Sequence, residues 1–278
     1  MPQIKTWLSS LFALFPEGRV KNIIRVFIYQ LRKRSFYTVR YNVSKDMWRV
    51  NTKETSLLFK KNPYHVFSTN PLFFKHFPDW KPDLIVDAGA FHGTVGLFLA
   101  KKFPAAKVYL LEPDPASFSI LVENIRLNNL SNAFPIKKGL WNKDGKVRFQ
   151  HGNELSSAVV REEKPNTISI ETISPSTLLS NYSQRKIFFK MNIEGAELEV
   201  LPACEILWKR NKMVLAVSSD HYINNEFTFK HIENFCKTHD MPFITEHMGR
   251  YKVTYISEKV TGEKVISENN KVVCAQKK

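Results

Sequence analysis

Beyond residue 82 the sequence alternates short apolar runs with segments of helical periodicity, and this alternation constrains the fold more than any other feature of the chain. The apolar runs cover residues 84–86, 108–111, 134–136, 187–191, 213–217, 243–245 and 252–256. The helices predicted between them cover residues 94–102, 115–128, 196–209 and 225–239. Strands alternating with helices are typical of an α/β fold with a mostly parallel sheet and helices on both faces. Two strand-like pieces that flank Thr261-Gly262 indicate antiparallel additions at the edge of that sheet.

The composition narrows the class of protein. Of the 278 residues, 43% are hydrophobic, which is ample for a buried core and excludes a chain that is disordered throughout. The three cysteines, Cys204, Cys236 and Cys274, are odd in number and form no CxxC pair, so we expect neither a disulfide framework nor a metal site. No apolar stretch reaches the roughly 20 residues that span a bilayer, and no cleavage site follows the N-terminal apolar patch. We therefore expect a cytoplasmic protein.

The net charge is concentrated near the N-terminus. The chain carries a formal charge of +15, and its first 50 residues hold ten Lys and Arg against two Asp and Glu, which is +8 of that total. Apolar residues recur at helical spacing on both sides of a turn at residues 16–18, first at Ile4, Trp7, Leu8, Leu11, Phe12 and Phe15 and then at Val20, Ile23, Ile24, Phe27, Ile28 and Leu31. Residues 40–80 contain three proline breakers and are predicted to be a connector with short helices. We thus expect a basic helical extension at residues 1–80 and one domain at residues 81–278.

The amphipathic hairpin predicted at the N-terminus allows two interpretations. In the first, the helix pair covers the core of the following domain and turns its charged face to solvent. In the second, residues 1–34 lie in the interface of an anionic membrane and make the protein peripheral to it. Apolar faces rich in aromatic residues and flanked by Arg and Lys occur in both settings, so the two interpretations stay open.

The first predicted strand runs into a loop that contains glycines. Residues 84–93 read LIVDAGAFHG, a buried strand that reaches Asp87 and is followed by Gly89, Gly93 and a helix. This is the layout of a nucleotide-type cofactor loop, in which glycines allow a tight turn and a close approach to the ligand. The Gly-x-x-x-Gly spacing differs from the Gly-x-Gly-x-x-Gly of dinucleotide binders, which favours a smaller adenosyl ligand and disfavours hydride transfer. Asp87 is expected to orient the loop or to meet the cationic end of the ligand.

Polar side chains follow three later strands. Glu112 follows the second strand, 25 residues after Asp87, near the position at which a carboxylate accepts hydrogen bonds from ribose hydroxyls. Asn192 and Glu194 follow the fourth strand, and ligands bind beyond the carboxyl ends of strands in open parallel sheets. After the fifth strand, His221 has the side chain whose pKa is ordinarily nearest neutrality and can remove a proton from a substrate hydroxyl. A loop histidine bonded to a neighbour is an equal alternative for His221.

Three blocks, in this order, resemble the FkbM family of class I S-adenosylmethionine-dependent methyltransferases. Residues 87–93 (DAGAFHG) resemble the family's D-x-G-A-x-x-G pattern. Residues 112–115 (EPDP) and 121–124 (LVEN) resemble its E-P-x-P block and the leucine and E-N of the helix that follows. Residues 190–197 (KMNIEGAE) are similar to its K-I-D-V-E-G-A-E block. The resemblance covers roughly residues 81–222.

The resemblance implies a Rossmann-like fold, with a seven-stranded sheet whose last strand is reversed, and S-adenosylmethionine as the cofactor. The residues expected at the cofactor are Asp87, Gly89, Ala90, Phe91, Gly93, Glu112 and Pro113, with Glu112 at the ribose. The residues expected at the reaction centre are Asn192, Glu194, Asp220 and His221.

Two positions depart from the family pattern. The family commonly has Asn where this chain has Phe91, so packing against the cofactor is expected to replace a hydrogen bond. It usually has Asp where this chain has Asn192, and an amide cannot act as a carboxylate base. Any such role must therefore pass to Glu194, Asp220 or His221.

The reaction implied by the family is an in-line methyl transfer, in which the enzyme positions the reactants and removes one proton from a hydroxyl acceptor. We expect O-methylation of a sugar, a glycan or a lipid-linked acceptor. RNA methylation is a second hypothesis because of the high net charge, although the sequence has no recognisable RNA-binding module and no Pro-Pro-Tyr type tetrapeptide. A non-catalytic, membrane-associated protein that retains the fold is a third, suggested by Asn192. The acceptor pocket is expected between the 40–80 connector, the loop at residues 154–157 and the stretch after Tyr222.

Overall fold

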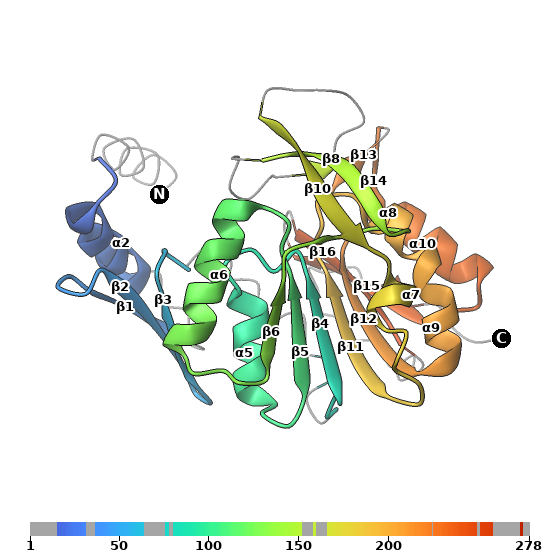
Figure 1. Cartoon of the computed structure of the whole chain (residues 1–278), viewed down its shortest axis with the longest axis horizontal. Helices are drawn as coiled ribbons and strands as arrows, with labels where there is room; N and C mark the ends of the chain where they lie inside the picture. The colour runs from blue at the N-terminus through green and yellow to red at the C-terminus, as the bar shows by residue number, and fades with distance from the viewer. Residues whose placement is uncertain are drawn as a thin grey trace.

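The computed structural model describes residues 16–31, 37–63, 76–77, 80–151, 158–159, 166–223, 225–248, 251–257 and 273–274. A large sheet carries helices on both faces, and a smaller sheet of N-terminal residues lies beside it (Figure 1). Three sequence predictions fall outside the described residues. They are the first helix of the N-terminal hairpin at residues 4–15, the loop at residues 154–157, and the strand-like pieces around Thr261-Gly262.

The large sheet contains the seven strands that the sequence predicts. In chain order they are β4 (Leu84–Ala88), β5 (Lys107–Leu111), β6 (Ala133–Ile136), β11 (Lys186–Met191), β12 (Lys212–Ser218), β15 (Phe243–Met248) and β16 (Tyr251–Ile256). Across the sheet their order is β15-β16-β12-β11-β4-β5-β6, with β17 (Val273–Cys274) added at the β15 edge. Among the seven, β16 is the one strand that runs antiparallel to the other six. The predicted Rossmann-like α/β fold with a reversed last strand is therefore confirmed.

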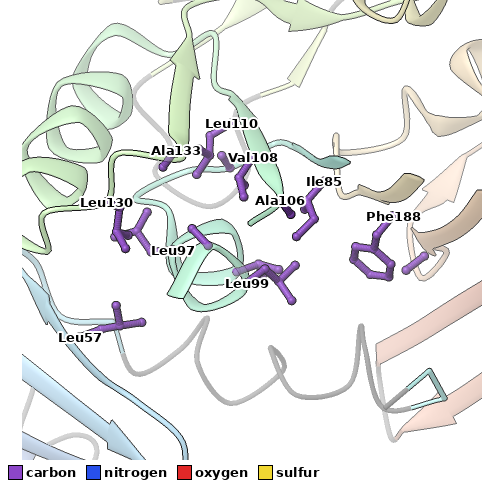
Figure 2. Close-up of a cluster of buried hydrophobic side chains, with 14 of the residues drawn as sticks. Leu57, Ile85, Leu97, Leu99, Ala106, Val108, Leu110, Leu130, Ala133 and Phe188 are labelled. Atoms are coloured by element: carbon purple, nitrogen blue, oxygen red, sulfur yellow. The ribbon is translucent and has the colours of Figure 1, made fainter. Parts of the chain in front are cut away.

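Helices cover both faces of this sheet, as predicted. One face carries α5 (Thr94–Lys102) and α6 (Pro115–Leu127), and the other carries α7 (Pro175–Leu178), α8 (Glu197–Val200), α9 (Glu205–Arg210) and α10 (Thr228–Thr238). On the first face, Leu97 and Leu99 of α5 belong to one apolar cluster with Ile85 and Val108 of the strands (Figure 2). All five residues of β4 are buried, because a central strand is covered on both sides.

One predicted helix is interrupted. Residues 196–209 form α8, a 3-10 turn at Pro202–Cys204 and then α9, instead of one continuous helix. Pro202 has no amide hydrogen to donate to the preceding turn, and the chain adopts the tighter 3-10 geometry there. The interruption leaves α8 as a short helix that begins with Glu197.

The prediction of a connector with short helices at residues 40–80 is wrong for residues 40–59, which form strands. β1 (Tyr37–Asn42), β2 (Met47–Thr52) and β3 (Ser56–Phe59) form an antiparallel sheet in the order β1-β2-β3. Tyr37, Val39 and Trp48 alternate with exposed residues and point inward, as the two-residue period of a strand requires. These side chains join the same apolar cluster as α5 and the large sheet. The domain boundary predicted near residue 80 stays a prediction.

α2 (Arg19–Leu31) corresponds to the second helix predicted for the N-terminal hairpin. It packs against the apolar cluster through Val26 and Tyr29, and the hydroxyl of Tyr29 accepts a 2.7 Å hydrogen bond from Asn62. Val20, Ile23 and Phe27 are exposed by 63%, 51% and 63%. Much of the predicted apolar stripe of this helix is therefore turned outward.

A four-stranded sheet between β6 and β11 in the chain was missed by the sequence analysis. It consists of β7 (Gly139–Leu140), β8 (Gly145–Gln150), β9 (Ala158–Val159) and β10 (Thr167–Ile173), in the order β7-β10-β8-β9. In the view of Figure 1, β8 and β10 lie above the upper ends of the large sheet. The two longer strands are mostly exposed or half-buried, so no continuous apolar run marks them in the sequence.

Candidate active site

The loop after β4 turns on two glycines in left-handed conformations. Gly89 has φ +71°, and a Cβ there would lie 1.9 Å from the carbonyl oxygen of Asn192. Gly93 has φ +85°, and a Cβ there would lie 2.3 Å from a methyl carbon of Leu97. Both positions combine a backbone that L side chains rarely adopt with a lack of room for any side chain. The loop between them (residues 89–93) is referred to below as the glycine loop.

Asp87 holds the glycine loop in place. Its Oδ1 lies 2.8 Å from Nζ of Lys190, and its Oδ2 accepts a 2.8 Å hydrogen bond from the amide of Gly96 in the first turn of α5. Nζ of Lys190 also donates to the carbonyl oxygens of Ala88 and Gly89, at 3.2 and 2.9 Å. Of the two roles predicted for Asp87, these contacts correspond to orientation of the loop.

Lys190 is a residue of this site that the sequence analysis did not single out. Its side chain is only 3% exposed, and the Asp87 side chain that faces it is 1% exposed. A buried ammonium group requires a charged or hydrogen-bonding partner. In the sequence, a lysine near the end of the otherwise apolar run IFFKM indicates a buried ammonium group that needs such a partner.

Glu112 follows β5 and lies against the glycine loop. It is buried, and its Oε2 accepts a 2.7 Å hydrogen bond from the amide of Phe91 while its Oε1 accepts a 2.9 Å bond from the amide of Asp114. Burial raises the pKa of Glu112 to about 7, although the two amide bonds act in the opposite direction. Because each carboxylate oxygen can accept more than one hydrogen bond, the group can still bind both hydroxyls of a ribose. Pro113 lies between Glu112 and Asp114, which caps α6.

Phe91 and His92 give the glycine loop an aromatic surface. Phe91 has φ +51°, and its ring stacks on that of His92 with the ring centroids 3.7 Å apart. Burial lowers the pKa of His92 to about 4, so this imidazole is uncharged at neutral pH. The stacked pair adjoins Glu112 through the Phe91 amide, and the packing of Phe91 against an adenosyl ligand stays a prediction.

The loop after β11 is shaped by Glu197. This buried carboxylate accepts hydrogen bonds from the amides of Ile193 at 2.6 Å and Gly195 at 2.8 Å. Between those two residues, Glu194 has φ +56°, a left-handed conformation that is uncommon for a residue with a side chain. The sequence analysis placed residue 197 in a predicted helix and gave it no role in the site, but the side chain of Glu197 organises the loop that presents Glu194.

Asn192 joins this loop to the glycine loop. Its backbone amide donates to the carbonyl oxygen of Ala88 at 3.1 Å, and its own carbonyl oxygen takes the space that a side chain on Gly89 would need. Its side-chain amide makes no hydrogen bond to any residue that the structure describes. The amide is therefore available to a ligand at the boundary between the two loops.

His221 faces the two glutamates from the segment after β12. Its Nδ1 lies 3.8 Å from an oxygen of Glu194, and its Nε2 lies 3.5 Å from an oxygen of Glu197. Burial favours a neutral imidazole, but the contact with Glu197 and the charges of both glutamates outweigh it and raise the pKa of His221 to about 9. Burial also raises the pKa of Glu194, against the effect of the nearby charge of His221.

The four predicted catalytic residues are thus brought together, since Asn192 and Glu194 share one loop, His221 faces it, and the charge of Asp220 acts on both Glu194 and His221. Asp220 lies next to His221 in the chain, and its Oδ1 accepts a 2.9 Å hydrogen bond from the hydroxyl of Ser218. The roles of these residues in a reaction stay predictions.

The fold and the two loops define a Rossmann-like domain in which an adenosyl-type cofactor loop lies beside a cluster of titratable side chains. The family description "Methyltransferase FkbM domain" matches residues 87–247, which is more than half of the chain. The protein therefore belongs to the FkbM methyltransferase family. Its cofactor is S-adenosylmethionine, and the glycine loop and the buried carboxylate of Glu112 fit the adenosyl part of that molecule.

Two curated relatives match part of the chain. Methyltransferase 1 of Beauveria bassiana (strain ARSEF 2860) is 27% identical over 148 residues, covering 45% of this chain and 59% of that protein. Methyltransferase sdnD of Sordaria araneosa is 28% identical over 151 residues, covering 42% of this chain and 58% of that protein. The chain thus spans less than two thirds of each relative. Among solved structures, ribosomal protein L11 methylase from Lactobacillus delbrueckii subsp. bulgaricus has a TM-score of 0.45 at 14% identity, over 72% of this chain and 82% of that one.

Among the residues that the structure describes, no group of three or more His, Cys, Asp or Glu side chains is arranged to hold a metal ion. No helix in the described segments has the length and apolar character needed to cross a membrane. Cys204 and Cys236 are buried free thiols, and burial raises the pKa of each to about 12.

Proposed function

We propose that this protein transfers a methyl group from S-adenosylmethionine to a hydroxyl of a sugar, a glycan or a lipid-linked acceptor. The observation that carries the proposal is the cluster of Glu194, Glu197 and His221, which follows β11 and β12 and adjoins the glycine loop. The cofactor supplies an electrophilic methyl group, and a hydroxyl acceptor has to be positioned and has to lose one proton. A partly buried carboxylate with a raised pKa is suited to accept that proton near neutral pH.

Glu194 is the proton acceptor in this proposal. Because the pKa of His221 is about 9, its imidazole already carries a proton at neutral pH and cannot accept another. The raised pKa of Glu194 makes it a stronger base than an exposed carboxylate. The role of base that the sequence analysis gave first to His221 thus passes to Glu194, with the imidazolium balancing its charge. The side-chain amide of Asn192 is available to orient the acceptor hydroxyl.

The variant Glu194→Gln tests this assignment. Glutamine keeps the shape of the side chain but is not a base, so we expect kcat to fall about 100-fold or more while the Kd for S-adenosylhomocysteine stays within about twofold. The assay follows isotopically labelled methyl groups from S-adenosylmethionine into oligosaccharides, lipid-linked sugars and RNA, with products identified by mass spectrometry. Glu199→Gln, on the short helix α8 that follows this loop, is the matched control and is expected to keep the wild-type rate. A Glu194→Gln variant of undiminished rate removes Glu194 from the mechanism.

The pH profile separates the two candidate bases. If Glu194 accepts the proton beside a protonated His221, the rate falls as the pH rises through about 9, where the imidazolium is lost. If His221 is the base, the rate instead rises until that pH is reached. Calorimetry that detects no binding of S-adenosylmethionine to the purified protein would contradict methyl transfer as a whole.

RNA methylation is the second candidate, and the formal charge of +15 is the observation that favours it. Labelled methyl groups that enter RNA but no carbohydrate or lipid-linked acceptor would replace the first proposal with this one. Binding of the cofactor without turnover on any of the three acceptor classes would favour a non-catalytic protein that retains the fold.

We also propose that residues 1–34 hold the protein at an anionic membrane surface. The support is the exposed side of α2, where Val20, Ile23 and Phe27 follow helical spacing. Two cations of that helix, Lys21 and Arg25, pair with Glu17 at 2.9 and 2.8 Å, so the exposed apolar residues support membrane binding more than these charges do.

Co-sedimentation with vesicles of phosphatidylserine and phosphatidylcholine tests the membrane proposal. We expect the triple variant Val20→Ser, Ile23→Ser, Phe27→Ser to lose most of its binding, because the buried apolar area supplies the free energy of insertion. Val122→Ser, which changes an apolar residue of α6 that is 41% exposed, is the control. Equal binding by the triple variant and the wild type would favour the interpretation of the helices as a cover of the core.

A further inference from the structure

β3 is an edge strand whose outward backbone groups are bound by asparagine side chains. Among the residues that the structure describes, its one strand partner is β2, and an edge strand leaves the N–H and C=O groups of alternate residues without a strand partner. At Leu58 both groups meet α6, since Oδ1 of Asn128 accepts from the amide and Nδ2 donates to the carbonyl oxygen, each at 2.8 Å. Two residues on, Oδ1 of Asn124 accepts from the amide of Lys60 at 2.9 Å. Two side chains one helical turn apart thus take the place of a neighbouring strand.

Asn124 also binds the glycine loop. Its Nδ2 donates to the carbonyl oxygen of His92 at 2.8 Å, and the residue is 0% exposed. His92 lies between two residues in left-handed conformations, Phe91 with φ +51° and Gly93 with φ +85°. Only a side chain that has both an acceptor and a donor can make these two bonds at once. One buried amide therefore connects the N-terminal sheet to the glycine loop.

Apolar packing and an ion pair hold β3 against α6 independently of Asn124. Leu57 of β3 is 1% exposed and lies in the cluster that includes Leu97 and Leu130 (Figure 2). Nζ of Lys60 lies 3.0 Å from a carboxylate oxygen of Glu123, the residue before Asn124. The position of β3 on α6 thus has other supports, so a substitution at residue 124 can remove one hydrogen bond without detaching the sheet.

We propose that Asn124 is a positioning residue for cofactor binding and that, through it, residues 37–60 form part of the cofactor-binding unit. By holding the carbonyl of His92, Asn124 fixes the short segment whose Phe91 amide binds the carboxylate of Glu112. The proposal rests on S-adenosylmethionine as the ligand of the glycine loop. The proposal adds the β1-β2-β3 sheet to the cofactor site. Among the described residues, the polar connection between this sheet and the glycine loop runs through Asn124.

Asn124→Asp and Asn128→Asp form a matched pair of variants. Each keeps an oxygen that accepts from β3 and loses an amide donor, but only Asn124→Asp loses the bond to the glycine loop. Calorimetry with S-adenosylhomocysteine, at a temperature where circular dichroism shows both full-length variants folded, is expected to give a Kd about tenfold weaker for Asn124→Asp. Asn128→Asp is expected to change the Kd less than about twofold. Equal weakening in both variants, or none in Asn124→Asp, overturns the proposal.

Hydrogen exchange of the ligand-free protein gives a second readout that a general loss of stability would not produce. We expect Asn124→Asp to raise amide exchange in peptides that cover residues 89–97, and Asn128→Asp to raise it in peptides that cover residues 56–61. Exchange that rises in the same peptides for both variants overturns the proposal. Asn124→Ser, which adds no charge, replaces Asn124→Asp in both experiments if the latter does not fold. A wild-type protein that does not bind S-adenosylhomocysteine contradicts the cofactor assignment, whereas the exchange pattern still reports on the role of Asn124 in the loop.

Discussion

An acid–base pair lies against each of the two loops, Asp87 with Lys190 beside the glycine loop and Glu194 with His221 at the loop after β11, and the two pairs differ in burial and in geometry. Asp87 and Lys190 lie 2.8 Å apart with side chains that are 1% and 3% exposed. Glu194 and His221 lie 3.8 Å apart with side chains that are 27% and 18% exposed. In the first pair both groups are also bonded to backbone, since Asp87 accepts from the amide of Gly96 in α5 and Lys190 donates to the carbonyl oxygens of Ala88 and Gly89. The first pair is therefore part of the scaffold, while the second retains room and lone pairs for another molecule.

This difference corresponds to the two ligands that a methyltransferase handles. The cofactor is the same in every turnover, so the polar groups around its loop can be fixed in advance by short bonds, such as those from the amides of Phe91 and Asp114 to Glu112. In the function proposed above, the acceptor loses a proton at each turnover, and that step requires groups whose protonation can change, such as Glu194 and His221.

The largest effect is expected for Lys190→Met. Removing one partner of a buried ion pair leaves Asp87 as an unpaired buried charge, which costs about 3–5 kcal/mol of unfolding free energy. Urea denaturation measures the loss. The double variant Asp87→Asn, Lys190→Met is expected to recover part of it, because no unpaired charge remains. Lys209→Met, at an exposed pair, is the control and should leave the urea midpoint nearly unchanged. If Lys190→Met is as stable as this control, the ion pair of Asp87 and Lys190 does not stabilise the fold.

A smaller and pH-dependent effect is expected for His221→Gln. The folded pKa of about 9 lies above the ordinary value of 6.5, so the stability from this ion pair is complete below about pH 6.5 and is lost as the pH rises through 9. The shift corresponds to at most about 3 kcal/mol. Urea midpoints measured from pH 6 to pH 10 should fall in the wild type and remain flatter in His221→Gln. His231→Gln, at an exposed ion pair, serves as the control and should follow the wild type. Parallel curves for all three proteins would show that His221 is not held as an imidazolium.

The large sheet could be predicted from the sequence because its strands are buried on both faces. β4, β11 and β12 are almost entirely buried and read as continuous apolar runs, and polar residues mark the points where they end. The N-terminal sheet gave no such signal. Its strands alternate inward aromatic or aliphatic residues with Thr and Arg, and the prolines that suggested a connector lie beyond them. A two-residue period over six residues is a weaker pattern than a buried run.

The parts of the site that were missed depend on contacts between distant residues. Asn124 and Lys60 are 64 residues apart in the chain, and Lys190 and Gly89 are 101 apart. Side chains that bind backbone groups at such separations leave no periodicity in the sequence. The residue types still hold some information, since a lysine at the end of an apolar strand and a buried asparagine each require a partner. The sequence does not specify which residue the lysine or the asparagine binds.

The smallest of the predicted effects concerns the pH dependence of cofactor affinity. It tests whether the polar groups around the glycine loop are fixed before the cofactor binds. The pKa of Glu112 is raised to about 7, and two ribose hydroxyls that donate to it require the ionised carboxylate. Affinity is therefore expected to decline as the pH falls through 7, to about tenfold weaker at pH 6 than well above pH 7 if the bound carboxylate stays ionised. Calorimetry with S-adenosylhomocysteine at several pH values measures this. Glu112→Gln should bind weakly with little pH dependence, because its amide cannot accept from both Phe91 and Asp114. A wild-type affinity that does not change with pH would mean that the two amide bonds keep Glu112 ionised over the whole pH range, despite its burial. The glycine loop and Glu112 would then already be fixed before the cofactor binds.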